Sequence, residues 1–373
     1  DFVREVAQCF WKSGSILMEI DNGTSLSYAA PMCFGLAPAR PDLKVIAIDG
    51  DGSVVAGLAF LTTLGRYSLS NFVLVVIDNG FYLSTDRGRL QTATRYGADL
   101  TGIAKAAGIE CAANVSTPEE TDDWVRRALN EEGPFVIVAK VDREARLDHS
   151  QRSPVAPGGS ADRTEASMLF RLWLANHPAS AGARVPRSAT RPDIPKEDLA
   201  ESLPGRGPAQ LIYQALKAAG INMFVYLPDS VTYPIQQLAE LDPEMLTICC
   251  AREDEGVAIA SGAYYGGLLP ALVIEGSGVG YSALALAGSI MRRTPLLIVS
   301  SHSEVLGVRF DHDSTSRLVN ESVLRALGIP YTVLARVEDA PAVIREAIHE
   351  MRILKMPAGV VLPPYVMSNR GLG

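Results

Sequence analysis

Two segments decide the fold of this chain: Val45-Ile-Ala-Ile-Asp-Gly-Asp-Gly-Ser53 and Phe72-Val-Leu-Val-Val-Ile-Asp-Asn-Gly-Phe-Tyr82. Each begins with an apolar run rich in β-branched residues, Val45–Asp49 and Phe72–Asp78, and such runs predict strands. Each run ends in a polar turn that contains glycine. The residues between them, Val54–Leu64, predict a helix. A strand, a helix and a second strand form the unit of a parallel sheet, which binds ligands at the carboxyl ends of its strands.

The same alternation continues along the chain and predicts the α/β class with two domains. We expect domains over residues 1–142 and 208–373, each with a mostly parallel sheet flanked by helices. Residues 143–207 are rich in Pro, Gly, Ser and Arg, which predicts a linker with one packed helix. The other strands expected are Ser15–Ile20, Phe135–Val141, Met223–Leu227, Leu246–Cys250, Ala271–Ile274, Leu296–Ser300 and Ala358–Leu362. The other helices expected are Phe2–Trp11, Leu100–Ala107, Pro118–Asn130 after the cap Thr117, Thr164–Asn176, Ala209–Ala219 before the C-cap Gly220, and Asp339–Met351.

Composition excludes several classes of protein. With a net charge of −8, the 373-residue chain lacks the basic surface that a nucleic-acid-binding protein needs. No apolar run is long enough to cross a membrane. The five cysteines are odd in number and form no Cys-x-x-Cys pair, so we expect a reducing, cytoplasmic location. The chain opens at Asp1 inside an expected helix, which leaves open whether residues precede it.

The two polar turns together predict a site for a magnesium ion and a diphosphate. The glycines of the turn Gly50-Asp51-Gly52-Ser53 let backbone N–H groups approach phosphate oxygens. Asp51 offers a carboxylate, Asn79 an amide oxygen and Phe81 its backbone carbonyl, all hard oxygen ligands for Mg²⁺. Either turn alone would be an ordinary end to a strand. Their occurrence together, each after a strand, favours the metal site.

This pattern resembles the signature of thiamine-diphosphate enzymes, in which Gly-Asp-Gly is followed at a characteristic distance by Asn, itself preceded by Asp or Asn. Gly50-Asp51-Gly52 and Asp78-Asn79 match this order and spacing. The tract from Asp78 to Thr85 is similar to the sulfopyruvate decarboxylase and phosphonopyruvate decarboxylase type. The resemblance implies that Asp51, Asn79 and the carbonyl of Phe81 bind the metal, and that the adjoining Gly80 and Tyr82 help to hold the cofactor.

A third position depends on the same resemblance. Leu26 precedes Asp51 at the distance where related enzymes carry a bulky apolar residue that wedges beneath the cofactor and holds it bent. A leucine of the hydrophobic core is the alternative interpretation, and both stay open.

The cofactor of this family also needs a carboxyl group beside its aminopyrimidine ring. The segment Arg252–Pro270 resembles the family's pyrimidine-binding domain, where a glycine and a proline follow the catalytic glutamate at fixed distances. Glu253 satisfies both spacings, through Gly262 and Pro270. Its neighbours Asp254 and Glu255 are explained by the general preference for acids at a helix start.

Weaker signals follow other strands of the second domain. Ser277 and Gly278 lie in a glycine-rich turn that resembles a cofactor-contacting turn of the family, although Glu275 and Tyr281 depart from the family pattern. The loop residues Asp229 and Ser230 are candidates for substrate binding or for a simple turn. His302 is a candidate for proton handling near the substrate carbonyl, and a structural histidine is the alternative.

These observations predict a thiamine-diphosphate- and Mg²⁺-dependent carboxy-lyase that converts a 2-oxo acid into an aldehyde and CO₂. The chain resembles a fusion of the two sulfopyruvate decarboxylase subunits, and the motifs do not name the acid. The resemblance implies a homodimer or a dimer of dimers with active sites at the interface. An acetolactate-synthase-like carboligase and a non-catalytic subunit that keeps the fold are the alternatives.

Overall fold

The computed structural model describes residues 26–82, 90–142, 163–179, 207–302 and 313–367. The chain divides into two compact units, Asp1–Thr190 and Arg191–Gly373, which are described separately. The expected helix Phe2–Trp11 and strand Ser15–Ile20 lie outside the described residues. Most of the expected linker does too, so its bounds stay a prediction.

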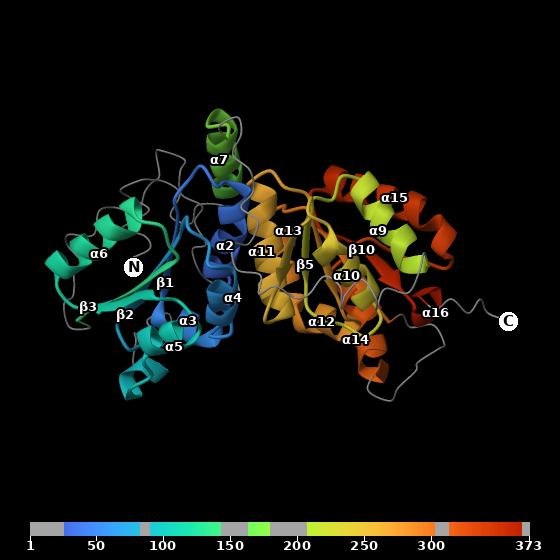
Figure 1. Ribbon diagram of the computed structural model, residues 1–373. Helices are drawn as coiled ribbons and strands as arrows, with labels where there is room; N and C mark the ends of the chain where they lie inside the picture. The colour runs from blue at the N-terminus through green and yellow to red at the C-terminus, as the bar shows by residue number, and fades with distance from the viewer. Residues whose placement is uncertain (1–25, 83–89, 143–162, 180–206, 303–312, 368–373) are drawn as a thin grey trace. The chain divides into compact units, whose positions relative to one another are not determined.

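The first unit contains a parallel sheet with strand order β1-β2-β4-β3 (Figure 1). Its strands are β1 (Val45–Gly50), β2 (Phe72–Asp78), β4 (Phe135–Lys140) and β3 (Cys111–Val115). Gly50 is paired with Ile77, so β1 and β2 end at the same edge of the sheet. The turns that follow these two strands are therefore neighbours, as the sequence predicts.

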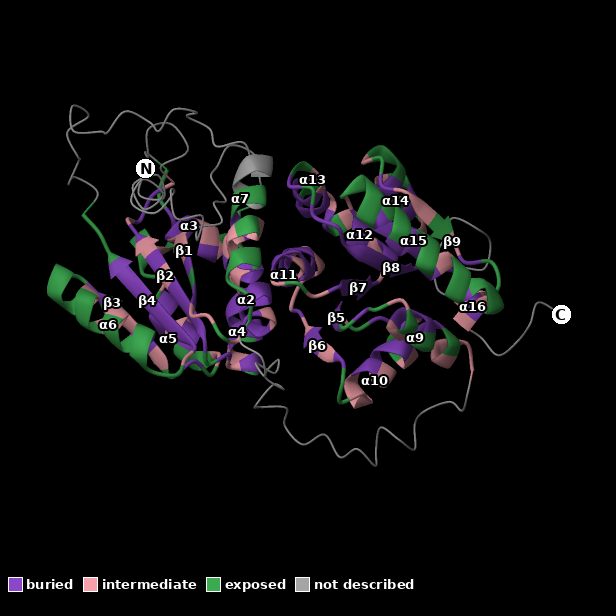
Figure 2. Ribbon diagram, turned by 90° about the horizontal axis from the view of Figure 1, so that it is seen from above, coloured by how far each residue is buried: buried purple, intermediate pink, exposed green. Residues whose placement is uncertain are grey.

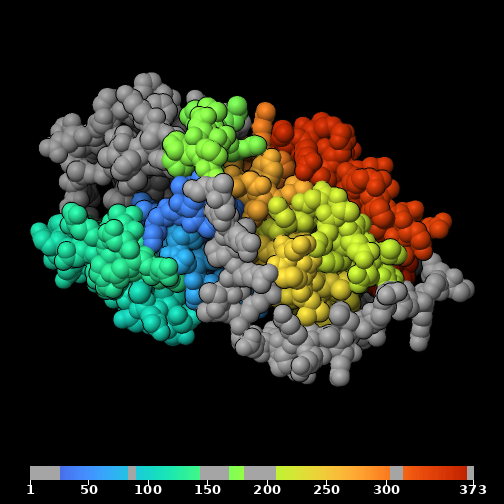
Figure 3. Space-filling view, turned by 45° about the horizontal axis from the view of Figure 1, so that its top comes forward, coloured from blue at the N-terminus to red at the C-terminus, as the bar shows by residue number. Residues whose placement is uncertain are grey.

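Helices cover this sheet and give it a core of aromatic residues. The ring of Phe34 contacts those of Phe60, Tyr67 and Phe72 at centroid distances of 5.6, 6.2 and 5.9 Å. Such edge-to-face contacts add to the stabilisation from apolar burial. The helices are α2 (Ala29–Ala39), α3 (Asp51–Ala56), α4 (Phe60–Tyr67), the 3₁₀ helix η3 (Ala93–Tyr96), α5 (Leu100–Ala106), α6 (Pro118–Asn130) and α7 (Arg163–Asn176). Helix α7 is visible on the surface in Figure 3. Its residues Met168 and Leu172 are exposed.

The second unit contains a six-stranded parallel sheet with strand order β6-β5-β7-β8-β10-β9. Every residue of β5, β7, β8 and β10 is buried, as expected for a parallel sheet covered on both faces (Figure 2). Its strands are β5 (Met223–Tyr226), β6 (Leu246–Cys249), β7 (Pro270–Ile274), β8 (Leu297–Ser301), β9 (Tyr331–Val333) and β10 (Ala358–Leu362).

The helices of the second unit form a layer on each face of this sheet. Ile212, Ile235 and Ile344, from α9, α10 and α15, share one apolar cluster with alternate strand residues. On the opposite face, Gly256 of α11 packs against Val225 and Leu272. The helices are α9 (Pro208–Ala218), α10 (Tyr233–Leu241), α11 (Glu253–Tyr265), α12 (Gly276–Tyr281), α13 (Ala283–Met291), α14 (Asp313–Ala326), the 3₁₀ helix η5 (Val337–Asp339), α15 (Ala340–Leu354) and α16 (Pro364–Met367).

The α/β class with parallel sheets is confirmed, and most expected elements agree with the structure to within a few residues. Helix α6 has the expected cap, because the side chain of Thr117 accepts a hydrogen bond from the N–H of Glu120. The C-cap glycine Gly220 has a φ of +93°. None of the described helices is long and apolar enough to span a membrane.

Two expectations about local structure are wrong. The helix expected over Val54–Leu64 is two helices, α3 and α4, which are separated near Gly57. A Cβ at Gly57 would lie 2.1 Å from Cβ of Ser27, so this close approach requires a glycine where the apolar pattern shows no break. The segment with Ser277 and Gly278, expected as a turn, forms the short helix α12.

Candidate functional site

The predicted metal ligands of the first unit lie at the ends of β1 and β2. Asp51 is the first residue of α3 and follows β1 directly, and its side chain is buried, with 1% of the residue exposed. Asn79 follows β2, next to Asp78. Because the two strands pair in parallel up to Gly50 and Ile77, both residues are held at one edge of the sheet.

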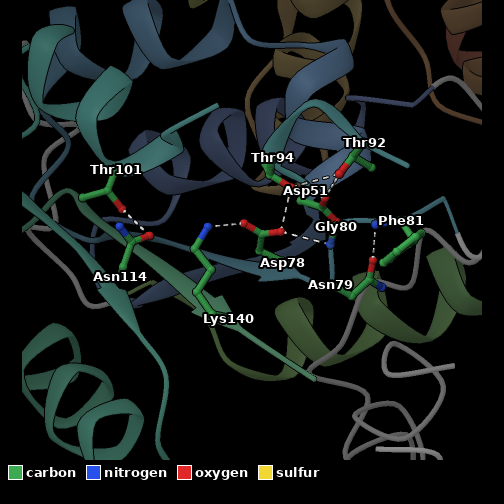
Figure 4. Close-up of polar contacts among 10 residues, drawn as sticks. All are labelled: Asp51, Asp78, Asn79, Gly80, Phe81, Thr92, Thr94, Thr101, Asn114 and Lys140. Atoms are coloured by element: carbon green, nitrogen blue, oxygen red, sulfur yellow. Dashed lines mark hydrogen bonds and ion pairs between the residues drawn. The ribbon is translucent and has the colours of Figure 1, made fainter. Parts of the chain in front are cut away.

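Two threonines orient the carboxylate of Asp51 (Figure 4). The hydroxyl of Thr92 donates a short hydrogen bond to Oδ2 of Asp51. The hydroxyl of Thr94 lies 2.9 Å from the same oxygen and 2.8 Å from Oδ1 of Asp78. These contacts connect the residues that follow β1 and β2 through the segment that leads into η3.

The charge of Asp78 is balanced within the unit. Lys140, the last residue of β4, forms a short ion pair with Oδ2 of Asp78, and the N–H of Gly80 donates to Oδ1 at 3.1 Å. The side chain of Asp78 is 4% exposed. Asp78 therefore has a structural role among the described residues, whereas no lysine or arginine described in the structure forms an ion pair with Asp51.

The turn after β2 has a conformation that requires glycine. Gly80 has a φ of +71°, in the region that side chains rarely adopt. The N–H of Phe81 donates to Oδ1 of Asn79 at 2.7 Å, which leaves that amide oxygen a second lone pair. The N–H of Thr92 donates to the carbonyl of Gly80 at 3.0 Å, so the threonine segment is attached to this turn.

The turn after β1 is also closely packed. A Cβ at Gly52 would lie 2.5 Å from the ring of Tyr82, so this ring covers the backbone of Gly52. The hydroxyl of Ser53 donates to Asp49 at 2.9 Å and accepts a hydrogen bond from the N–H of Ser27 at 2.8 Å. Ser53 thus holds the turn together, and its predicted contact with a cofactor stays a prediction.

Leu26 is described as a surface residue. It is 51% exposed and precedes Ser27, whose φ is +72°. Within this chain it does not belong to the core, which disfavours the alternative of a core leucine. Its place beneath a cofactor stays a prediction.

The oxygen atoms of this edge fit a magnesium ion. Both side-chain hydrogen bonds that the described residues form with Asp51 end on Oδ2, so Oδ1 is the oxygen that can face a cation. The described residues contain no group of three or more His, Cys, Asp or Glu side chains that could bind a metal ion alone. A cation here would therefore take Asp51, the Asn79 amide and a carbonyl, with phosphate and water as its other ligands, which is the usual arrangement for Mg²⁺.

The second unit presents Glu253 at the start of α11, after β6. The residue is half-buried. Burial raises the pKa of its carboxyl group above the usual value, and the charges of Asp254 and Glu275 raise it further, although a backbone hydrogen bond and Arg252 oppose them. A carboxyl group with a raised pKa can keep its proton nearer to neutral pH, which suits proton exchange with a ligand.

The backbone of α12 packs directly against Glu253. A Cβ at Gly278 would lie 2.5 Å from Cγ and 2.9 Å from Oε1 of Glu253, so only glycine leaves room for this side chain. Ser277 precedes it in the same helix. Glu275 accepts a short hydrogen bond from the buried Ser316 of α14, which holds a second carboxylate near the start of α12.

The two acids beside Glu253 have other contacts. The guanidinium of Arg252 donates to both oxygens of Asp254, at 3.0 and 2.8 Å, and lies 5.0 Å from the ring centroid of Tyr281. Glu255 is buried, and its Oε1 lies 3.5 Å from the N–H of Ala251. These contacts favour the choice of Glu253 that spacing made, although its role stays a prediction.

The weaker candidates have mainly local contacts. Oδ2 of Asp229 accepts from the N–H and the hydroxyl of Thr232 at 2.8 and 2.7 Å, so this oxygen stabilises its own loop, and Ser230 is exposed. Their contact with a substrate stays a prediction. His302 is 3% exposed, with a φ of +63°. The side chain of Asn320 donates to its carbonyl at 2.7 Å, which supports this unusual backbone conformation.

Sequence reasoning missed several of these residues. Thr92 and Thr94 follow no strand and belong to no motif that we recognised. Lys140 could have been found, because it ends the strand expected over Phe135–Val141. Ser316 and Asn320 lie on α14, for which we had no prediction.

Comparisons with known proteins agree with this arrangement. Residues 4–139 match the family described as "Thiamine pyrophosphate enzyme, C-terminal TPP binding domain". The chain is 41% identical over 116 residues to sulfopyruvate decarboxylase subunit beta of Methanocaldococcus jannaschii, covering 31% of this chain and 60% of the relative. It is 28% identical over 144 residues to subunit alpha of Methanothermobacter thermautotrophicus, covering 38% of this chain and 85% of the relative. It is 30% identical over 161 residues to phosphonopyruvate decarboxylase of Streptomyces viridochromogenes, covering 43% of this chain and 38% of the relative.

A solved structure has a similar fold over most of the chain. Transketolase from Campylobacter jejuni superposes with a TM-score of 0.57 at 14% identity, covering 92% of this chain and 61% of that chain. The chain spans 60% of the length of the beta subunits that it matches. Residues 4–139 thus match the C-terminal TPP binding domain of thiamine pyrophosphate enzymes, and the chain is homologous to both sulfopyruvate decarboxylase subunits and to phosphonopyruvate decarboxylase.

Proposed function

We propose that this protein is a thiamine-diphosphate- and Mg²⁺-dependent carboxy-lyase. Its substrate is a 2-oxo acid of the sulfopyruvate or phosphonopyruvate class, and its products are an aldehyde and CO₂. The observation that carries the proposal is the pair of strand ends in which buried Asp51 lies beside Asn79, within the segment that matches the TPP binding family.

In this proposal the first unit holds the diphosphate end of the cofactor. Oδ1 of Asp51, the amide oxygen of Asn79 and the carbonyl of Phe81 bind Mg²⁺, which in turn binds the phosphates. The turn from Gly50 to Ser53 approaches those phosphates through its backbone. Gly80 and Tyr82 hold the cofactor from the other side, and Leu26 supports its central rings.

The second unit provides the groups that move protons. When bound, the cofactor supplies a nucleophilic carbon and accepts the electrons released as CO₂ leaves. Glu253 donates a hydrogen bond to the aminopyrimidine ring, which the raised pKa of its carboxyl group favours. Ser277 and Gly278 lie against that ring. His302 handles a proton at the substrate, and Asp229 with Ser230 contacts the substrate.

We propose further that the working protein is a homodimer or a dimer of dimers. The groups that hold the diphosphate and the group that activates the ring belong to different units of the chain, and each complete site would combine units from two copies. A closed, two-fold arrangement is the commonest way for identical chains to assemble. The odd number of cysteines favours a cytoplasmic location.

The proposal is tested first by binding and then by turnover. Isothermal titration of the purified protein with thiamine diphosphate should give saturable binding that requires Mg²⁺. Sulfopyruvate and phosphonopyruvate should then each be assayed for CO₂ release, with and without an acceptor aldehyde. Release of CO₂ with a free aldehyde supports the decarboxylase, whereas a condensed hydroxyketone indicates a carboligase. Absence of cofactor binding contradicts the proposal and indicates a non-catalytic subunit.

A further inference from the structure

The segment that contains Thr92 and Thr94 belongs to no motif that we recognised in the sequence, yet it contacts the buried carboxylate of Asp51. Both threonine hydroxyls contact the same oxygen of Asp51, Oδ2. Two contacts on one oxygen restrict rotation of the carboxylate about its Cβ–Cγ bond. They also occupy Oδ2, so a cation that approaches Asp51 meets Oδ1 alone.

The hydroxyl protons are fewer than the oxygen contacts in this cluster. Thr92 and Thr94 lie 2.9 Å from each other, both contact Asp51, and Thr94 also contacts Asp78, which makes four close contacts. Each hydroxyl has one proton to donate, so only two of these contacts can be hydrogen bonds at a time. The negative charge on Asp51 is therefore only partly compensated by its hydroxyl neighbours, which favours a cation at Oδ1.

The threonine segment is attached to the other predicted ligands. The N–H of Thr92 donates to the carbonyl of Gly80 at 3.0 Å, and Phe81 forms an isolated β-bridge with Gln91. Thr92 is 1% exposed, so its position is determined by packing. The orientation of the Asp51 carboxylate is thus coupled to the turn that carries Asn79 and the Phe81 carbonyl.

Lys140 helps to keep Asp78 away from the cation. Lys140 forms an ion pair with Oδ2 of Asp78, while Thr94 and the N–H of Gly80 contact Oδ1. Asp78 therefore has both oxygens engaged. Of these two carboxylates, a cation at this edge would therefore meet that of Asp51, through Oδ1.

We propose that Thr94, assisted by Thr92, is a positioning residue that restricts Asp51 to single-oxygen coordination and thereby favours Mg²⁺ over Ca²⁺. Mg²⁺ requires near-octahedral geometry with short bonds, which a rigid single-oxygen carboxylate supports. Ca²⁺ accepts flexible geometry and also binds carboxylates through both oxygens. This inference rests on the proposed function, because it assigns Asp51 as the metal ligand.

The experiment measures metal affinity rather than turnover. Apparent dissociation constants for Mg²⁺ and for Ca²⁺ are determined by calorimetry on the full chain with saturating thiamine diphosphate, for the wild type, Thr94→Val, Thr92→Val and Thr94→Ser. Loss of a residue that supports a metal ligand typically weakens metal binding by about 10- to 100-fold. We expect Thr94→Val to weaken Mg²⁺ binding about tenfold and Ca²⁺ binding clearly less, with Thr92→Val in the same direction. Thr94→Ser, which keeps the hydroxyl, should restore the wild-type ratio.

Thr101→Val is the matched control. Thr101 is a buried threonine of the same unit whose hydroxyl donates to Oδ1 of Asn114 at 3.0 Å, away from the Asp51 contacts (Figure 4). Its loss should lower the Tm about as much as Thr94→Val does, because each variant removes partly buried side-chain hydrogen bonding. It should leave the Mg²⁺/Ca²⁺ ratio within about twofold of the wild type, well inside the effect expected for a supporting residue.

The possible failures are distinguishable. If Thr94→Val leaves the ratio of the Mg²⁺ and Ca²⁺ dissociation constants unchanged, or weakens the affinity for both cations equally, this inference is overturned while the proposed function stands. A wild-type protein that binds neither cation together with thiamine diphosphate overturns the proposed function, and this inference with it.

Discussion

Asp51 and Glu253 are each the first residue of a helix that follows a parallel strand. The surroundings of their carboxylates nevertheless differ. Asp51 is buried under two hydroxyl groups that contact one of its oxygens. Glu253 is half-buried among other acids, and burial raises the pKa of its carboxyl group. The same position in the fold thus gives one carboxylate that is oriented by donors and one that is biased towards its protonated form.

This difference shows how one architecture can serve two kinds of chemistry. A metal ligand must keep its direction, which the hydroxyl groups of Thr92 and Thr94 favour by contacting Oδ2 of Asp51. A group that exchanges a proton must have a pKa nearer to the working pH, which partial burial and neighbouring charges achieve. The strand ends supply only the location, and residues from later segments decide the chemistry.

The largest effect is expected from Glu253→Gln. The substitution keeps the shape of the side chain and removes the proton that the proposal requires, so turnover of the 2-oxo acid should fall on the order of 10²- to 10⁴-fold, the range of general acid–base catalysis. Thiamine diphosphate binding by calorimetry should remain. The control is Asp254→Asn, which removes the ion pair with Arg252 and should change turnover little. Equal losses in both variants would contradict the choice of Glu253.

Asp51→Asn should have the next largest effect, on metal binding. Loss of the negative charge should weaken Mg²⁺ affinity on the order of a hundredfold, at the upper end of what even supporting residues contribute. Calorimetry with Mg²⁺ at saturating thiamine diphosphate measures this. Asp42→Asn, which breaks the ion pair with Arg40 in the same unit, provides a control with the same change in charge. Unaltered Mg²⁺ binding in Asp51→Asn would reject Asp51 as the ligand.

A smaller effect is expected from Gly278→Ala. The added Cβ would displace Glu253, from whose Cγ it would lie 2.5 Å, and turnover should fall about tenfold, because a misplacement of about 1 Å can reduce rates up to 10²-fold. Gly288→Ala is the control, since the three atoms nearest to its Cβ would belong to the guanidinium of Arg292, the first at 2.6 Å, and not to Glu253. If both alanine variants kept full turnover, the packing of α12 against Glu253 would be irrelevant to activity.

The smallest effects concern thermal stability. Replacing one carboxylate in the second unit should raise the Tm, whereas replacing one in the first unit should lower it. The pKa of Glu253 is raised by burial above 4.5, so its ionised form destabilises the folded state as the pH rises past that value. Glu253→Gln should therefore have a higher Tm than the wild type at pH 8, and the difference should vanish below pH 4.5.

The ionised form of Asp42 has the opposite effect on stability from that of Glu253. The hydrogen bond from Arg40 lowers the pKa of Asp42 below 3.8, so its ionised form stabilises the folded state at neutral pH. Asp42→Asn should lower the Tm at pH 7, and the loss should disappear as the pH falls through the lowered pKa. Thermal unfolding followed by circular dichroism from pH 3 to 8 checks both variants. A Tm difference for Glu253→Gln that does not depend on pH would contradict the raised pKa.

Strong local signals made most of the fold predictable. The central strands are continuous apolar runs, and α6 has a complete capping box, so their bounds needed no tertiary information. Short elements with small or polar residues escaped prediction, such as β3 (Cys111–Val115) and β9 (Tyr331–Val333). The break at Gly57 was equally hidden, because it results from contact with Ser27, which is distant in the sequence.

The candidate site divides in the same way. The sequence by itself determined the α/β class and identified Asp51, Asn79 and Glu253 as candidate site residues. It could do so because strand periodicity, turn glycines and motif spacing are local properties. Only the tertiary structure decided that Thr92 and Thr94 contact Asp51, that Lys140 neutralises Asp78, and that Gly278 packs under Glu253. The physical reason is that the orientation, charge balance and pKa of a carboxylate depend on whichever atoms surround it, and folding brings those atoms from distant parts of the chain.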